Sequence, residues 1–113
     1  IRNSEVTMPK FLIKASYNPD GVRGLIKDGG SKRRAVVQKL IEGARGKLEA
    51  FYYAYGADDA IIIADLPDAT SGVAISLTVN ATGAVRLSTT PLITPEEIDA
   101  AGKKTVKYKA PGA

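Results

Sequence analysis

Two stretches of the chain alternate between apolar and polar positions, a pattern typical of strands with one buried face. In the first, residues 11–17, one face carries Phe11, Ile13, Ala15 and Tyr17. In the second, residues 84–90, one face carries Val85, Leu87 and Thr89. The pattern therefore predicts one strand near the start of the chain and another in its last third.

Two further strands are predicted between Gly46 and Pro67, where they form the central hairpin of the expected fold. The runs LEAFYYAY (48–55) and AIIIADL (60–66) are joined by GADD (56–59), and Gly and Asp are residues that turns favour. Strict alternation in the first run places Leu48, Ala50, Tyr52 and Ala54 on one face and Glu49, Phe51, Tyr53 and Tyr55 on the other.

The second run of the hairpin is apolar on both faces apart from Asp65. A strand with one face in water should alternate with polar residues, so both faces of the sheet are expected to be covered. The helices of a chain this short suffice for one face only. We therefore expect another copy of the protein to cover the second face, which gives a homodimer or a larger oligomer.

Helix-start signals follow the first predicted strand. Asn18-Pro19-Asp20 predicts an N-cap and a first helical turn, and Gly29-Gly30 is expected to interrupt the helix that follows. Ser31 is expected to cap a second helical segment. This segment should end within residues 43–46, where a glycine can supply the left-handed residue.

Two more helices are predicted in the second half of the chain. Asp68 caps one of them, and its content of Thr, Ser and Gly predicts a short or irregular helix. Thr94-Pro95-Glu96-Glu97 is a capping box and predicts a final helix running towards Tyr108. Residues 110–113 are expected to form a loose tail.

The predicted order is strand, helix, strand, strand, helix, strand and a terminal helix. This order is typical of an α+β ferredoxin-like fold, a split βαβ arrangement, here with an extra C-terminal helix. The 113-residue chain is expected to form a single domain over residues 8–109, and residues 1–7, which precede Met8, are interpreted as an N-terminal extension. With a second copy on the open sheet face, the predicted assembly is a dimeric α+β barrel.

The residue types that are missing narrow the chemistry. The chain contains no His, Cys or Trp, which excludes Cys/His zinc sites, Cys nucleophiles and His-based triads. Acid–base chemistry would have to use Asp, Glu, Tyr or Lys, and a metal would have to be a hard cation held by oxygen. Neither a metal nor a cofactor is predicted.

The charge pattern adds little to this picture. The net charge is +4, and the basic residues bunch at 32–34 and 103–109, which is more typical of a solvated surface than of a nucleic-acid interface. No apolar run reaches the roughly 18 residues of a membrane helix. Because no signal sequence is present either, the expected location is the cytoplasm.

Several segments together resemble the GYD-domain family, small domains of largely unassigned function. These segments are MPKFLIKASY, GGSKRR, RGKLE before FYYAYG, IADLPD, NATGAVR and TPLITPEE, which cover most of the chain from Met8 onward. The resemblance implies a ferredoxin-like fold and oligomerisation, without an established reaction. Of the family's glycine, tyrosine and aspartate, Gly56 and Asp59 match the first and last, and Asp58 stands where the tyrosine would be.

Four residues are candidate ligand contacts, namely Tyr17, Arg34, Tyr53 and Asp59. Arg34 follows a Gly-Gly-Ser helix start, where backbone N–H groups and a guanidinium can hold an anion; the alternative is a solvated turn after a helix break. Asp59 is a general base, a cation ligand or merely a turn residue. The tyrosines either line a pocket or pack in the core or a subunit interface. No catalytic residue is assigned.

Two basic residues on predicted strands, Lys14 and Arg86, would need a partner if they lie in a cleft, and Asp65 is the candidate. Such a pair would be either a structural ion pair or part of a substrate clamp.

The leading hypothesis is a homo-oligomeric domain that binds a small polar or anionic ligand between sheet and helices. The rival hypothesis is a non-catalytic assembly or regulatory module, in which the covered sheet face only holds subunits together. A third, weaker interpretation is binding of nucleic acid through the basic clusters.

Overall fold

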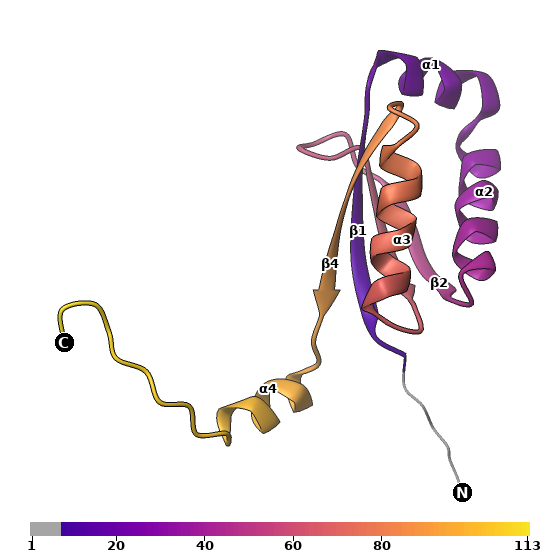
Figure 1. Ribbon diagram of the computed structural model, residues 1–113. Coiled ribbons are helices and arrows are strands. Elements are labelled where there is room, and N and C mark those ends of the chain that lie inside the picture. The colour runs from indigo at the N-terminus through magenta and orange to yellow at the C-terminus, as the bar shows by residue number, and fades with distance from the viewer. Residues whose placement is uncertain (1–7) are drawn as a thin grey trace, which may run out of the picture.

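The computed structural model describes residues 8–113 as a sheet with helices on one face, followed by a projecting C-terminal arm (Figure 1). In chain order the elements are β1 (Lys10–Tyr17), α1 (Pro19–Asp28), α2 (Gly30–Gly43), β2 (Lys47–Tyr53), β3 (Ala60–Asp65), α3 (Ala69–Asn80), β4 (Val85–Leu92) and α4 (Pro95–Gly102). The predicted extension, residues 1–7, lies outside the described residues.

The four strands form one antiparallel sheet in the order β2-β3-β1-β4. Phe11 of β1 is paired with Ala64 of β3 on one side and with Pro91 of β4 on the other. This order places β1 and β3, the first strands of the two strand–helix–strand crossovers, at the centre of the sheet. The predicted ferredoxin-like α+β fold is confirmed.

The core lies between the sheet and the helices α2 and α3. It is built by Phe11, Ile13, Ile41, Ile62, Ala64, Leu66 and Ile75. Leu66 and Ile41 are its largest completely buried side chains. On β3 the residues facing the helices are buried, whereas Ile61 and Ile63 on the opposite face are half-buried. Ile61 and Ile63 lie on the face that was predicted to need a second copy. Because both remain partly accessible to solvent, this face is open in the single chain.

A β-bulge in β2 makes the predicted face assignment of this strand wrong. Leu48 pairs with Ala64 and Ala50 pairs with Ile63, so Glu49 is an extra residue between two consecutive pairs. Leu48 and Phe51 both pack against the core, although strict alternation would put residues three apart on opposite faces. The bulge resolves this conflict because it switches the facing of every residue before it.

The helix connections differ from the prediction at two positions. Gly29, with φ of 88°, joins α1 to α2 and is the N-cap of α2, so Ser31 lies inside the helix and does not cap it. At the other end of α2, the left-handed residue is Arg45, with φ of 65°, rather than a glycine. Gly46 is needed for a different reason: a Cβ there would lie 2.4 Å from the carbonyl oxygen of Asp65.

The caps of α1, α3 and α4 are as predicted, but the lengths of α3 and α4 are not. Asn18, Asp68 and Thr94 each accept a hydrogen bond from a backbone N–H three residues on. The segment expected to be short or irregular is a regular twelve-residue helix, α3, because Gly72 and Ile75 bury its inner face on the sheet. The last helix ends at Gly102 and does not continue towards Tyr108, because nothing buries its apolar residues.

Thr94→Ala is expected to lower the helicity of α4 without moving the main unfolding transition. Thr94 and Glu97 form both halves of the capping box, and the loss of such a cap costs about 1 kcal/mol. Because an eight-residue helix without packing is marginal, the loss should melt α4 locally. The measurement is far-UV circular dichroism with a thermal scan. A clear fall in the midpoint of the main unfolding transition would show that α4 contributes to the stability of the rest of the domain, contrary to this prediction.

Candidate functional site

A cleft opens between α2 and α3 above the central strands of the sheet. Because α2 packs on β2 and α3 packs on β4, a space of about 260 Å³ remains above β1 and β3. Its floor includes Ile13, Ala15, Ala60 and Ile62, and its walls include Val37 and Leu40 of α2 and Ile75 and Val79 of α3. The cleft is therefore almost entirely apolar along its length.

One end of the cleft carries two polar side chains, Tyr17 from the end of β1 and Arg33 from the first turn of α2. Both are half-buried. Burial raises the pKa of Tyr17 above its ordinary value of 10.0, and neighbouring Tyr53 adds to the effect while the Arg33 guanidinium opposes it. The phenol of Tyr17 therefore stays protonated near neutral pH and can donate a hydrogen bond beside a positive charge.

Arg33 was missed by the sequence interpretation, which selected Arg34. Arg33 stands four residues before Val37 and seven before Leu40, and all three line the cleft. This i, i+4, i+7 spacing defines one helix face and could have identified Arg33. Arg34 is exposed and lines a separate hollow of about 350 Å³ beside Gly30, Ser31 and Tyr53.

Tyr53 lies between these two hollows. Its hydroxyl donates a hydrogen bond to the carbonyl oxygen of Gly30 at 3.0 Å, and its ring would be 3.1 Å from a Cβ placed on Gly30. Phe51 packs edge-on against the same ring, with the centroids 5.0 Å apart. Burial raises the pKa of Tyr53, and the Arg33 guanidinium acts against this rise. Tyr53 thus fixes the start of α2, which carries both arginines, on the sheet.

Asp59 is joined to the backbone of β1. Its Oδ2 accepts a hydrogen bond from the backbone N–H of Tyr17 at 2.8 Å, and its own N–H donates to the carbonyl oxygen of Ala15 at 2.8 Å. Asp59 therefore holds the end of β1 in place and positions Tyr17. The structure brings Asp59, Tyr17 and Tyr53 together, with Arg34 on the far side of Tyr53.

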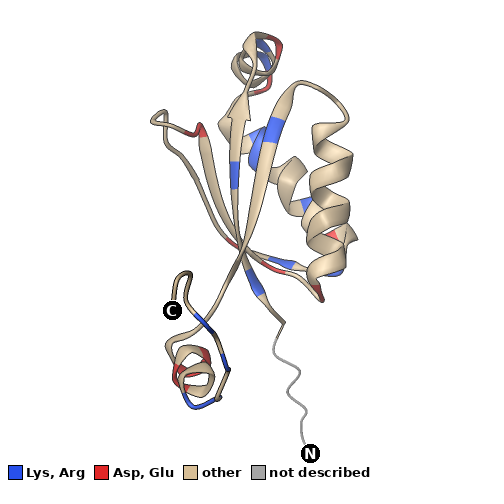
Figure 2. Ribbon diagram, turned by 60° about the vertical axis from the view of Figure 1, so that its left-hand side comes forward, with Lys and Arg blue, Asp and Glu red and all other residues tan. Residues whose placement is uncertain are grey.

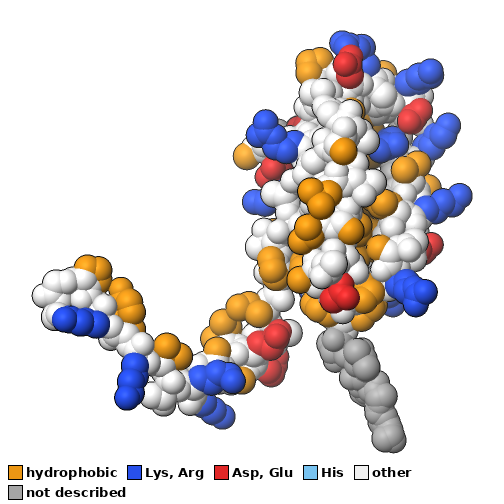
Figure 3. Space-filling model, in the orientation of Figure 1, with side chains coloured by type: hydrophobic (Ala, Val, Ile, Leu, Met, Phe, Trp, Pro, Cys, Tyr) orange, Lys and Arg blue, Asp and Glu red, His pale blue; other side chains and the backbone are white. Residues whose placement is uncertain are grey.

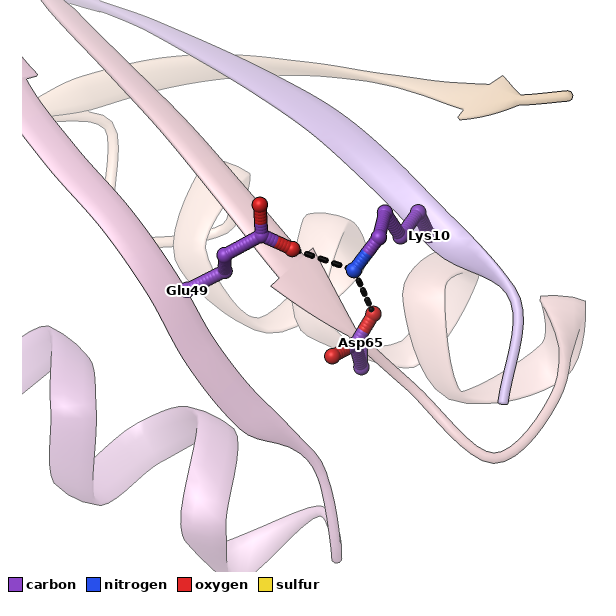
Figure 4. A network of polar contacts seen from close by, with 3 residues as sticks. All are labelled: Lys10, Glu49 and Asp65. Carbon is purple, nitrogen blue, oxygen red and sulfur yellow. Dashed lines mark hydrogen bonds and ion pairs between the residues drawn. The ribbon is translucent and has the colours of Figure 1, made fainter. Parts of the chain in front are cut away.

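The opposite face of the sheet carries a network of charges. Lys10 of β1 donates to Asp65 of β3 at 2.8 Å and also pairs with Glu49, the bulge residue of β2 (Figure 4). The hydrogen bonds to Asp65 and Glu49 raise the pKa of Lys10. The partner of Asp65 is thus Lys10, and not Lys14 or Arg86 as expected. Lys14 instead lies 3.9 Å from Asp58.

Among residues 8–113, no three acidic side chains converge in a way that could hold a metal ion. In the same part of the chain, no helix is both long enough and apolar enough to cross a membrane.

Comparison with models of known protein families identifies the family of this chain. A family model described as the GYD domain matches residues 11–101, which is most of the chain. The chain belongs to the GYD-domain family. The resemblance seen in the sequence is confirmed, and the matched range includes the sheet apart from Lys10, the cleft of this GYD domain and nearly all of α4.

A solved structure supports the fold of this GYD domain. The crystal structure of MtbAldR superposes with a TM-score of 0.53 at 22% sequence identity, covering 83% of this chain and 58% of that one. At this identity the likeness concerns the fold alone, and the GYD domain spans somewhat over half the length of that protein. A search of curated proteins gives no significant match.

Proposed function

We propose that this GYD domain binds a small molecule with an apolar body and an anionic end in the cleft between α2, α3 and the sheet. The observation that carries the proposal is the pairing of a 260 Å³ apolar cleft with a half-buried arginine and a neutral phenol at one end. Ligand sites are commonly apolar pockets with a few convergent polar groups. The apolar lining changes the expected ligand from a wholly polar molecule to an amphiphilic one.

Arg33 is suited to the anionic end because its charge is unpaired in the described chain. The ion pairs formed within residues 8–113 involve Lys10, Lys14 and Arg23. A half-buried guanidinium gains more from a bound carboxylate or sulfonate than a fully solvated one, because the local dielectric constant is lower.

The other candidate residues take supporting roles in this proposal. Tyr17 donates a hydrogen bond to the same anionic end, Asp59 positions Tyr17, and Tyr53 holds the start of α2. Arg34 is proposed as an outer contact in the neighbouring hollow. These polar groups are hydrogen-bond donors or are already bonded to the backbone, so the proposal is one of binding, and we assign no reaction.

The fluorescent probe 1-anilinonaphthalene-8-sulfonate, which has an aromatic body and one sulfonate, tests the proposal by fluorescence titration. Arg33→Ala is expected to weaken its binding about tenfold, or about 1.4 kcal/mol, through loss of a charge-assisted hydrogen bond. Arg34→Ala is the matched comparison, since it removes the same charge one residue away and outside the cleft, and the loss of this outer contact should weaken binding less than the loss of Arg33. Equal affinities for both variants, or a native protein that does not bind the probe, would contradict the proposal.

A second candidate function, a module for self-assembly, is favoured by the open sheet face. Ala50, Ile63 and Leu12 are consecutive cross-strand neighbours there, and Tyr52 lies beside Ile61 with 71% of its surface exposed. Figure 2 shows this face with no helix of the compact body over it. Such an apolar row favours a second copy packed sheet to sheet, the predicted dimeric barrel. The cytoplasmic location remains a prediction.

Light scattering at micromolar concentration tests the assembly. A dimer or larger species is expected, and Ile63→Lys should convert it to a smaller species because a charge is placed in the apolar row. Gln38→Lys, at an exposed position of α2 on the other side of the sheet, is the control and should leave the oligomer intact. A native protein that is already monomeric would rule out this function.

A further inference from the structure

Within the described residues 8–113, no other element packs on the C-terminal arm, residues 93–113. Every residue in it is exposed, including Ile93, Ile98, Val106 and Tyr108, with exposed fractions of 54–81%. The Cα radius of gyration is 17.5 Å, well above the roughly 13 Å of a compact domain near this size, because the arm projects from the body (Figure 1). Four large apolar side chains in water indicate a segment that is completed by a contact outside its own chain.

The helix α3 presents the surface that such a segment would cover. None of its twelve residues is charged, and its outer side exposes Val73 and Leu77, one turn apart, at 57% and 67%. A hollow of about 220 Å³ lies along this stripe and extends to Phe11 and Pro91. Figure 3 shows hydrophobic side chains gathered over α3 and again along the arm. An uncharged helix with an apolar outer side is typical of a covered helix rather than a solvated one.

The junction between β4 and α4 directs the arm away from its own α3. Pro95 restricts Thr94 to an extended conformation, with φ of −80° and ψ of 159°. In the capping box, the Thr94 N–H donates to the Glu97 carboxylate and the Glu97 N–H donates to the Thr94 hydroxyl. The capping box and Pro95 thereby set the direction in which the arm leaves the sheet. A contact within the same chain would require the arm to reverse at this junction, whereas a contact with another chain requires no change.

We propose that the arm of each copy docks its apolar residues, Ile98 foremost, onto the Val73–Leu77 stripe of α3 in a second copy. Exchange of identical arms between two copies gives a closed, two-fold arrangement in which each chain provides one arm and one stripe. The occupant of the stripe is therefore another molecule of the same protein. This inference uses neither the ligand cleft nor the open sheet face, so it stands or falls independently of both proposed functions.

Cysteine cross-linking tests the exchange on the full chain, which contains no native cysteine. Leu77→Cys and Ile98→Cys proteins are mixed in equal amounts and treated with a short bismaleimide. A covalent dimer at twice the 11.9 kDa chain mass is expected in the mixture. In the matched control, an Ile26→Cys protein takes the place of the Leu77→Cys protein. Ile26 is 77% exposed on α1 and lies outside the stripe.

The outcomes separate exchange from other contacts. Dimer formed in the Leu77→Cys mixture and largely lost with Ile26→Cys supports the proposal. Dimer formed equally in both mixtures reflects random collision and overturns it. No dimer in either mixture means that the stripe is free or is covered by its own arm, and this also overturns it. Adding Val73→Glu to the Leu77→Cys protein should abolish the dimer while leaving the circular dichroism spectrum unchanged, because the exposed position tolerates a charge when the stripe is free.

Discussion

Leu66→Ala is expected to lower the free energy of unfolding by about 2–5 kcal/mol, the usual cost of removing a buried leucine side chain. Leu66 is completely buried at the end of β3. Its methyl groups fill the space beside two glycines: a Cβ on Gly46 would lie 2.7 Å from one of them, and a Cβ on Gly72 would lie 3.6 Å from the other. The cavity left by alanine cannot be filled by these neighbours, because neither has a side chain.

Urea denaturation followed by circular dichroism measures this effect, with Ile26→Ala as the control. Ile26 is 77% exposed on α1, so its truncation should change the free energy of unfolding by less than about 0.5 kcal/mol. A loss of similar size in the two variants would mean that Leu66 is not in a packed core. The backbone of Leu66 also bonds to the carbonyl oxygen of Pro9 at 3.0 Å, and alanine preserves that bond.

Asp59→Ala is expected to cost about 1.5–3 kcal/mol of stability, which is the range for a hydrogen bond to a charged group. The substitution removes the carboxylate that accepts the backbone N–H of Tyr17 and so frees the end of β1. Asp58→Ala is the matched control in the same turn. Its carboxylate makes long, weak contacts, at 3.4 Å from the Ser16 hydroxyl and 3.9 Å from the Lys14 ammonium group. Its loss should therefore cost less than about 1 kcal/mol.

Denaturation of the two variants, together with Asp59→Asn, distinguishes the roles of the adjacent aspartates. Asparagine keeps an oxygen acceptor for the Tyr17 N–H and should recover part of the lost stability. Because Tyr17 lines the cleft, Asp59→Ala should also weaken binding of the sulfonate probe, whereas Asp58→Ala should not. If Asp59→Ala weakened probe binding at unchanged stability, Asp59 would be a direct ligand contact rather than a positioning residue.

Features that depend on a few neighbouring residues were predictable from the sequence. The caps at Asn18, Asp68 and Thr94 need only a side-chain acceptor and an N–H three residues away. The ferredoxin-like fold followed from the order of helix and strand signals, because few topologies accommodate that sequence of elements. The open apolar face of β3 was visible in the unbroken run of Ile61, Ile62 and Ile63.

Part of the candidate site could also be predicted, namely a cleft between sheet and helices with Tyr17 among its lining residues. The choice between Arg33 and Arg34 could not, because it depends on the rotation of α2 about its axis. That rotation is set by Tyr53 bonding to Gly30 and by Ile41 packing into the core. A helix turns by about 100° per residue, so neighbouring arginines necessarily face different surroundings.

The sequence alone determined the ferredoxin-like fold, the starts of α1, α3 and α4, and the family, since each depends on local periodicity or short motifs. Only the tertiary structure decided the facing of β2, the residue at the end of the cleft and the course of the chain after Leu92. The bulge at Glu49 exists because Leu48 and Phe51 must enter the same core, and Lys10 on a distant strand receives the displaced carboxylate. Such choices depend on contacts between residues far apart in the chain, and the spacing of residues along one segment does not contain them.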